Sequence, residues 1–118
     1  MAAKDVLGRY GEDLAVEHLQ AAGLVVLARN WRCVHGELDI VAEDGSTLVF
    51  CEVKTRSGAR FGSPAEAVNR AKAARIRRLA LAWLAEAERG WAELRFDVVG
   101  VVRPAGGPPT VEHLRGAF

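Results

Sequence analysis

Two consecutive runs near the middle of the chain, 36–43 and 47–55, alternate in the pattern that places successive side chains on opposite faces of a β-strand. Asp44-Gly45 between the runs is typical of a tight hairpin turn. Both runs carry apolar residues on both faces, so we expect a sheet that is covered on its two sides. The pattern therefore predicts a β-hairpin inside a layered structure.

Charged residues stand in this hairpin at positions where core side chains would be expected. With a two-residue loop, Asp39 faces Phe50 across the hairpin. Glu37 then faces Glu52 on the same side of the sheet, and Lys54 shares that side. Three carboxylates packed together repel one another unless a divalent cation, a proton or nearby arginines neutralise them.

The remaining pattern predicts two helices and three further strands. Apolar residues recur at helical spacing over 6–22, and Gly23 follows as a stop signal. A second helix is expected to begin with Ser63 as N-cap, Pro64 at the first position and Glu66 closing a capping box. The helix should run to about residue 88, and the strands are predicted at 24–28, 94–102 and, at an edge, 110–114.

The first helix has two unusual features. Gly8 and Gly11 lower its helix propensity, which suggests the close approach of another backbone. Glu12 lies at the border between the apolar and polar faces. It is either a solvated carboxylate or a side chain that reaches over the edge of the adjacent sheet.

The second helix separates its cations between two faces. Arg70, Arg77 and Arg78 fall opposite the apolar stripe and should be exposed. Lys72 falls within the stripe, so it should point towards the sheet. It either extends along the apolar surface to water or serves the acidic cluster or a phosphate. The buried stripe is predicted to contain Val68, Ile76, Leu79, Ala80, Trp83 and Ala87.

Two other positions have competing interpretations. Trp31 stands between arginines and either stacks on a base or ribose or packs as a core aromatic. Arg95 and Asp97 share a face of the strand at 94–102 and are interpreted as a structural ion pair. The segment 103–109 is rich in proline and glycine and is expected to be a loop.

The order of elements is helix, three strands, helix, strand, which predicts an α/β protein. We expect one domain over 1–118, with a core at about 6–102 and a loop and loose tail at 103–118. Neither cysteine has zinc-type or disulfide-framework spacing. No signal-peptide core or membrane-spanning run is present in the sequence, so the expected location is the cytoplasm, away from membranes.

The net charge of +1 conceals a strong segregation. Residues 1–53 hold four Lys and Arg against nine Asp and Glu, whereas residues 54–78 hold eight against one. A cation-rich segment directly after an acidic cluster suits an enzyme that acts on a polyanion, and it also suits a solvated helix face.

Phosphodiester hydrolysis requires the parts that this hairpin carries. Two or three carboxylates hold one or two Mg²⁺ ions, which neutralise the scissile phosphate and lower the pKa of the attacking water. A lysine two residues after Glu52 can position that water or stabilise negative charge. Glu-x-Lys is a weak signal alone, but the residues flanking Glu52 are apolar and an acidic strand precedes it.

Several segments together resemble the bacterial YraN-like protein family over roughly residues 8–102. That family is grouped with the restriction-endonuclease-like, PD-(D/E)xK nuclease fold and is similar in layout to archaeal Holliday-junction resolvases. The resemblance implies a mixed central sheet flanked by helices. The segments are Gly11-Glu12, Asn30-Trp31-Arg32, Gly36-Glu37-Leu38-Asp39, Glu52-Val53-Lys54-Thr55-Arg56, residues 62–68 with Lys72, and Arg95-Phe96-Asp97.

The resemblance also implies roles for individual residues. Asp39 matches the first acidic position of the nuclease pattern, and Glu52 with Lys54 matches the (D/E)xK pair. Glu12 matches the first-helix glutamate of the resolvase group. Leu38 stands where that pattern has a proline, a change that affects backbone geometry rather than ligand chemistry.

We therefore expect a Mg²⁺- or Mn²⁺-dependent endonuclease that acts on nucleic acid, DNA in the first instance, in repair or recombination. The expected catalytic residues are Asp39, Glu52, Lys54 and Glu12; the metal ligands Asp39, Glu52, the Val53 carbonyl and Glu37; and the nucleic-acid contacts Arg56, Arg60, Lys72 and Arg75. A domain this small reaches one strand at a time, so duplex cutting would require a homodimer. The alternatives are a non-catalytic nucleic-acid-binding module and a structural domain whose carboxylates are satisfied by Arg56, Lys72 or Arg95.

Overall fold

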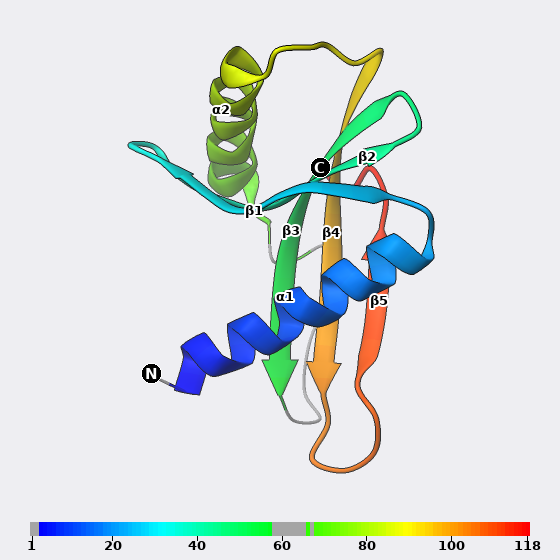
Figure 1. Cartoon of the computed structure of the whole chain (residues 1–118). Helices are drawn as coiled ribbons and strands as arrows, with labels where there is room; N and C mark the ends of the chain where they lie inside the picture. The colour runs from blue at the N-terminus through cyan, green and yellow to red at the C-terminus, as the bar shows by residue number, and fades with distance from the viewer. Residues whose placement is uncertain (1–2, 58–65, 67) are drawn as a thin grey trace.

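The chain folds as a mixed five-stranded sheet with two helices packed against it (Figure 1). The structure, a computed structural model, describes residues 3–57, 66 and 68–118. Neither helix in this part of the chain combines the length and apolar character needed to cross a bilayer. The elements are α1 (Ala3–Ala21), β1 (Val25–Cys33), β2 (Gly36–Asp44), β3 (Thr47–Ser57), α2 (Arg70–Glu86), β4 (Glu93–Arg103) and β5 (Thr110–Leu114).

The strands lie in chain order across the sheet, β1-β2-β3-β4-β5. β3 and β4 are parallel, because the chain crosses over through α2 between them, and the other neighbours are antiparallel. This mixed sheet confirms the predicted α/β class, and β5 extends the predicted order by one edge strand.

The hairpin register differs from the prediction by two residues. Asp44 pairs with Thr47, so the turn is formed by Gly45 and Ser46 rather than by Asp44 and Gly45. Gly45 has φ +61° whereas Ser46 keeps a negative φ, as in a type II′ turn with glycine first. A shift of two residues preserves which face each side chain of the paired segment occupies. Beyond the ladder the alternation is interrupted beside Asp39, because Leu38 and Val41 pack in the same cluster.

Two apolar layers cover the sheet, as the pattern of the hairpin predicted. On β3, Val49 and Cys51 pack in one cluster with Leu19 of α1, whereas Leu48 and Phe50 pack in the other with α2. Since adjacent residues of a strand point to opposite faces, the two helices lie on opposite sides of the sheet. The α2 side contributes Ile76, Leu79 and Ala80 to its cluster, with Val68 and Trp83 beside them.

Helix α1 approaches β3 very closely at Gly11. A Cβ at this buried glycine would stand 1.7 Å from the Thr55 hydroxyl oxygen, so no larger residue fits without displacement. The neighbour is a side chain rather than the backbone that was expected, and Gly8 has nothing within 4 Å of such an atom. The approach places the next residue, Glu12, over the edge of β3.

Helix α2 begins later than predicted. The helix starts at Arg70, and Asn69 is its N-cap because its side chain accepts a hydrogen bond of 2.9 Å from the Lys72 amide. Glu66 lies outside the α-helix, and the predicted cap at residues 63–65 lies outside the described residues. The predicted start of α2 at Ser63 was therefore wrong, and Asn69 provides the N-cap of the helix.

Strand β1 contains a left-handed residue in its middle. Asn30 has φ +52°, the one positive value at a non-glycine residue in the described part of the chain. Ala28 and Trp31 lie three residues apart yet pack in the same α2-side cluster, so the alternation of faces is broken between them. Trp31 thus packs as a core aromatic, the interpretation left open by the sequence. The kink lies opposite Asp39, between the pairs of residues 29 with 40 and 31 with 38.

The C-terminal segment is packed rather than loose. β5 pairs with β4 from Val98 to Val102, the Gly116 amide bonds to Asp97, and the Ala117 amide bonds to the Phe96 carbonyl. Phe118 then lies against the Phe96 ring, with 5.5 Å between ring centroids. The expected loose tail was wrong because these contacts, distant in sequence, retain it.

Candidate active site

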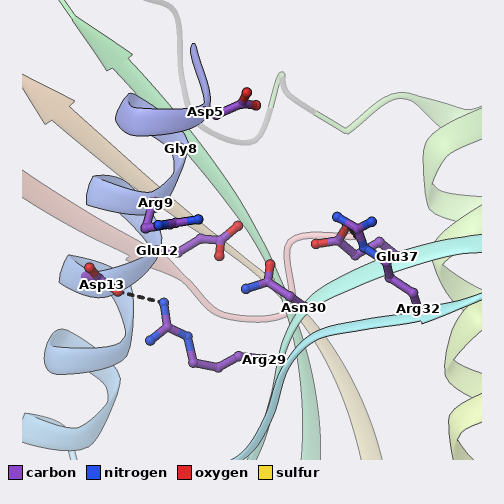
Figure 2. Close-up of a pocket in the computed structure, with 9 residues that line it drawn as sticks. All are labelled: Asp5, Gly8, Arg9, Glu12, Asp13, Arg29, Asn30, Arg32 and Glu37. Carbon is purple, nitrogen blue, oxygen red and sulfur yellow. Dashed lines mark hydrogen bonds and ion pairs between the residues drawn. The ribbon is translucent and has the colours of Figure 1, made fainter. Parts of the chain in front are cut away.

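Three carboxylates from two elements meet beside the point where β2 leaves β3. Glu12 of α1 and Glu37 and Asp39 of β2 each place an oxygen within 4.8 Å of the other two. The ladder between β2 and β3 ends at the pair of Ile40 and Cys51, so Asp39 is the first residue beyond it. Figure 2 shows Glu12 and Glu37 directed from opposite sides into the same cleft.

Asp39 has the most perturbed environment of the three. Burial raises its pKa, the Glu52 carboxylate raises it further, and together with Glu12 they bring the pKa to about 8. The Val53 backbone amide donates a hydrogen bond of 2.9 Å to the Asp39 Oδ2 atom and acts in the opposite direction. At neutral pH this carboxyl group therefore carries a proton unless a cation replaces it.

Glu12 is held at the cluster from two sides. Burial is the largest cause that raises its pKa, and Glu37 adds to it, whereas the neighbouring Asn30 side-chain amide lowers the pKa. Gly11, the preceding residue, is where α1 packs closely against Thr55 of β3. Of the two interpretations of Glu12, a solvated carboxylate or a side chain that reaches over the sheet, the structure supports the second.

Glu52 and Glu37 each form an ion pair with a cationic side chain. The Lys72 Nζ atom lies 2.5 Å from Glu52 Oε1, and Glu52 keeps only 13% of its side chain exposed. The Arg32 guanidinium lies 2.9 Å from Glu37 Oε2 at a more exposed position. The prediction that Lys72 points to the sheet is confirmed, and Asp39 itself has no ion pair within the described chain.

Open cavities flank the carboxylates on either side. One of about 300 Å³ is lined by Glu12, Asp39, Glu52, Val53 and Lys54 among others. Another of about 370 Å³, on the α2 side, is lined by Glu37, Asp39, Glu52, Lys72 and Arg75 among others. Asp39 and Glu52 line both, so these two carboxylates are reachable from either face.

A third and larger cleft of about 800 Å³ lies between α1 and the β1–β2 hairpin (Figure 2). Arg9, Arg29 and Arg32 line it together with Glu12 and Glu37. The Arg29 guanidinium forms an ion pair of 2.7 Å with the Asp13 carboxylate. The acidic centre is therefore bordered by arginines that the sequence did not single out as contacts.

The predicted site residues divide into three groups. Asp39, Glu52, Glu12 and Glu37 come together, and Lys54, Val53, Lys72 and Arg75 line the same cavities. Arg56 is half-buried further along β3 and lies outside the described linings. Arg60 falls outside the described residues. The structure assigns the Val53 amide to Asp39, and the role expected for its carbonyl stays a prediction.

The donor set fits a hard divalent cation. Carboxylate oxygens are the ligands that Mg²⁺ and Mn²⁺ favour, and neither histidine nor cysteine belongs to this cluster. Two oxygens bound to one Mg²⁺ are at most about 4.2 Å apart, twice the bond length. The spacing of up to 4.8 Å therefore requires only small side-chain rotations. Such an ion would also remove the repulsion that raises the pKa of Asp39.

A second cluster of ligand-type residues, Cys51, Asp97 and His113, does not fit a metal. Asp97 Oδ1 accepts hydrogen bonds from Arg95 Nε and the Gly116 amide, both at 2.9 Å. Its Oδ2 accepts from Arg95 at 2.9 Å and from His113 Nε2 at 2.7 Å. All four lone-pair positions of the carboxylate are thus occupied. Burial also raises the pKa of the Cys51 thiol, which stays protonated.

Sequence reasoning missed Asn30 as a site residue. A signal was available, since Asn is one of the few residues that tolerate the left-handed region and it stood beside a predicted strand. Its contact with Glu12 depends on the packing of α1 against β1, which periodicity does not reveal.

The fold and this centre define a class: an α/β protein whose mixed sheet carries a half-buried carboxylate cluster where two strands diverge. The chain belongs to the Uncharacterised protein family UPF0102, which it matches over residues 11–101. A UPF0102 protein of Frankia casuarinae is 64% identical over 118 residues and covers the whole of both chains. Its counterpart in Acidothermus cellulolyticus is 53% identical over 127 residues, covering 99% of this chain and 96% of the relative.

Proposed function

We propose that this protein is a metal-dependent endonuclease that hydrolyses phosphodiester bonds in nucleic acid. The observation that carries the proposal is the half-buried Asp39 carboxyl, packed against Glu12 and Glu52 without an ion pair among the described residues. A protein gains no stability from such an arrangement, and perturbed carboxylates in a cleft are typical of functional sites. The resemblance to PD-(D/E)xK nucleases, with its Holliday-junction resolvase layout, supports the reaction class.

Asp39, Glu52, Glu12 and Glu37 are the residues that would hold the ion. When bound, Mg²⁺ or Mn²⁺ neutralises the scissile phosphate and lowers the pKa of the attacking water. The remaining chemistry belongs to side chains of this protein. The Val53 amide fixes the orientation of Asp39, which sets the geometry that the ion meets.

Lys54 is proposed to orient the water and to stabilise the negative charge that develops on the phosphate. It is exposed and lines the same cavity as Asp39 and Glu52, so a substrate in that cavity would contact it. Lys72 and Arg75 line the opposite cavity and are proposed to contact flanking phosphates. These contacts would make binding weaken as salt increases.

One observation favours a second candidate, a nucleic-acid-binding module of the same fold without catalysis. Glu52 and Glu37 are already neutralised by Lys72 and Arg32. If those ion pairs persist, the cluster needs no metal, and the basic residues would bind phosphate alone. The two candidates therefore differ in metal affinity rather than in nucleic-acid affinity.

Calorimetric titration with Mn²⁺ separates the two candidates. We expect binding in the wild-type protein and its loss in Asp39→Asn, with Glu112→Gln, an exposed carboxylate on β5, as the matched control. The absence of binding heat in the wild type, or heat unchanged in Asp39→Asn, would favour the non-catalytic module.

Cleavage assays test the reaction itself. Branched, flap and single-stranded DNA and RNA are incubated with Mn²⁺, Mg²⁺ or EDTA. We expect divalent-dependent cleavage of at least one substrate, abolished in Asp39→Asn and reduced at least 100-fold in Lys54→Ala. Cleavage that persists in both variants would show that this centre is not the catalytic one.

A further inference from the structure

Asn30 combines two features that are independent of each other. Its backbone lies in the left-handed region at φ +52°, inside a strand whose other non-glycine residues avoid that region. Its side-chain amide lies beside the Glu12 carboxylate in the cleft between α1 and the β1–β2 hairpin, where it lowers the pKa of Glu12. Figure 2 shows the amide directed into the cleft between Glu12 and Glu37.

The left-handed conformation is unfavourable for a residue with a Cβ, and such residues concentrate at functional sites. Asn30 is also exposed, so water would satisfy its amide if Glu12 were absent. Neither burial nor hydrogen bonding therefore requires this conformation. What the conformation accomplishes is to direct the amide of a strand residue towards the helix.

The position of the kink supports the same conclusion. Asn30 lies opposite Asp39 in the β1–β2 ladder, between the pairs of residues 29 with 40 and 31 with 38. It therefore stands between two members of the carboxylate cluster that come from different elements. A residue in this place controls how closely Glu12 approaches Asp39.

We propose that Asn30 is a positioning residue that holds the Glu12 carboxylate in the cluster. The inference rests on the proposed function in one respect, namely that the cluster binds a divalent cation. Hydrogen bonds from neighbours of this kind orient metal ligands, and their removal typically weakens metal affinity by about 10–100-fold. Asn30 would act through Glu12 and would not touch the ion.

Substitution by glycine separates this role from that of a turn residue. Asn30→Gly keeps the left-handed backbone without strain and removes the amide, whereas Asn30→Ala removes the amide and adds strain. His35→Gly, at an exposed position in the turn between β1 and β2, is the matched control. Mn²⁺ affinity is measured by calorimetry, and the melting temperature is measured in EDTA.

We expect Asn30→Gly to melt at or above the wild-type temperature and to bind Mn²⁺ about tenfold more weakly. Asn30→Ala should show the same loss of affinity and a lower melting temperature, and His35→Gly should retain wild-type affinity. Wild-type Mn²⁺ affinity in Asn30→Gly would overturn the proposal, because Asn30 would then be only a turn residue.

A double-mutant cycle in EDTA keeps the inference independent of metal binding. The melting temperatures of Asn30→Gly, Glu12→Gln and the double variant are compared with the wild type. A combined effect that differs from the sum supports the positioning contact, and additive effects overturn it. A wild-type protein without Mn²⁺ heat would contradict the metal function alone, and the cycle would still decide the contact.

Discussion

Asp97 and Asp39 are both carboxyl groups within the same sheet, and their surroundings are opposite. Burial alone would raise the pKa of Asp97, but hydrogen bonds from His113, Arg95 and the Gly116 amide outweigh it and the pKa is lowered. Asp39 has one backbone donor and carboxylate neighbours, and its pKa rises to about 8. Asp97 thus has donors and cations around its carboxylate, whereas Asp39 lies among like charges.

The difference separates a structural acid from a functional one. Asp97 joins β4 to the C-terminal segment through His113 and Gly116, so its charge stabilises the fold. The interpretation of Arg95 and Asp97 as a structural pair is thereby confirmed. In the metal-free folded protein, the ionised Asp39 carboxylate is repelled by its acidic neighbours, and only a cation or a proton relieves this repulsion. The five predictions below test this contrast.

Asp97→Asn is expected to have the largest effect on stability. A neutral amide with one accepting oxygen would replace the carboxylate that Arg95 and His113 share, and this loss of charge in a buried ion pair costs about 3 kcal/mol. Urea unfolding measures the loss, with Glu112→Gln as an exposed control. A loss below about 1 kcal/mol would mean that the network is not a structural clamp.

The same network predicts acid sensitivity. Since the folded-state pKa of Asp97 is lowered, its contribution is complete above the unfolded value of about 4 and is lost as the pH falls through the folded value. The urea midpoint of the wild type should therefore fall below pH 4, and that of Asp97→Asn should fall less steeply. Parallel curves would contradict the assignment.

Mn²⁺ is expected to produce the next largest change in stability, by binding to the carboxylate cluster around Asp39. A ligand that binds only the folded state at 100 times its Kd stabilises that state by about 2.7 kcal/mol. The melting temperature should rise with Mn²⁺ in the wild type and in Asp97→Asn, if the latter folds, and should stay constant in Asp39→Asn. An equal rise in Asp39→Asn would place the ion elsewhere.

Asp39→Asn should stabilise the metal-free protein, the reverse of Asp97→Asn. Because the folded-state pKa of Asp39 is raised to about 8, its contribution is complete below pH 4 and declines as the pH rises to 8. The gain should be about 1–2 kcal/mol at pH 9 and about half of that at pH 6. Urea unfolding in EDTA at pH 9 and pH 6 measures the gain. A variant that is less stable than the wild type at pH 9 would contradict the repulsion proposed at Asp39.

Lys72→Met should have the smallest effect, although it also removes a cation from a carboxylate. The ion pair with Glu52 is partly exposed, with 30% of the Lys72 side chain accessible, so the loss should stay below about 1 kcal/mol. Arg78→Met, on the exposed face of α2, is the control for thermal melts in EDTA. A loss as large as that of Asp97→Asn would favour the non-catalytic module.

Much of the fold could be predicted from the sequence because its signals are local. Strand periodicity on both sides of Gly45 located the hairpin, and helical spacing located α1 and α2 to within a few residues, except at the start of α2. The turn was misplaced because two glycine-containing turns fit the same pattern. The start of α2 was predicted too early because the residues from Ser63 to Glu66 match a capping box, whereas the N-cap in the structure is Asn69.

The sequence also predicted that Glu37, Asp39 and Glu52 lie close together, and all three line one cavity. The reason differs from the predicted one, because the alternation of faces on β2 is interrupted beside Asp39. What only the tertiary structure decided is which neighbour each carboxylate meets. Lys72 and Asn30 reach the cluster through packing between elements distant in the chain. Whether a carboxylate is neutralised, as Asp97 is, or lies among like charges, as Asp39 does, depends on long-range contacts that no local pattern encodes.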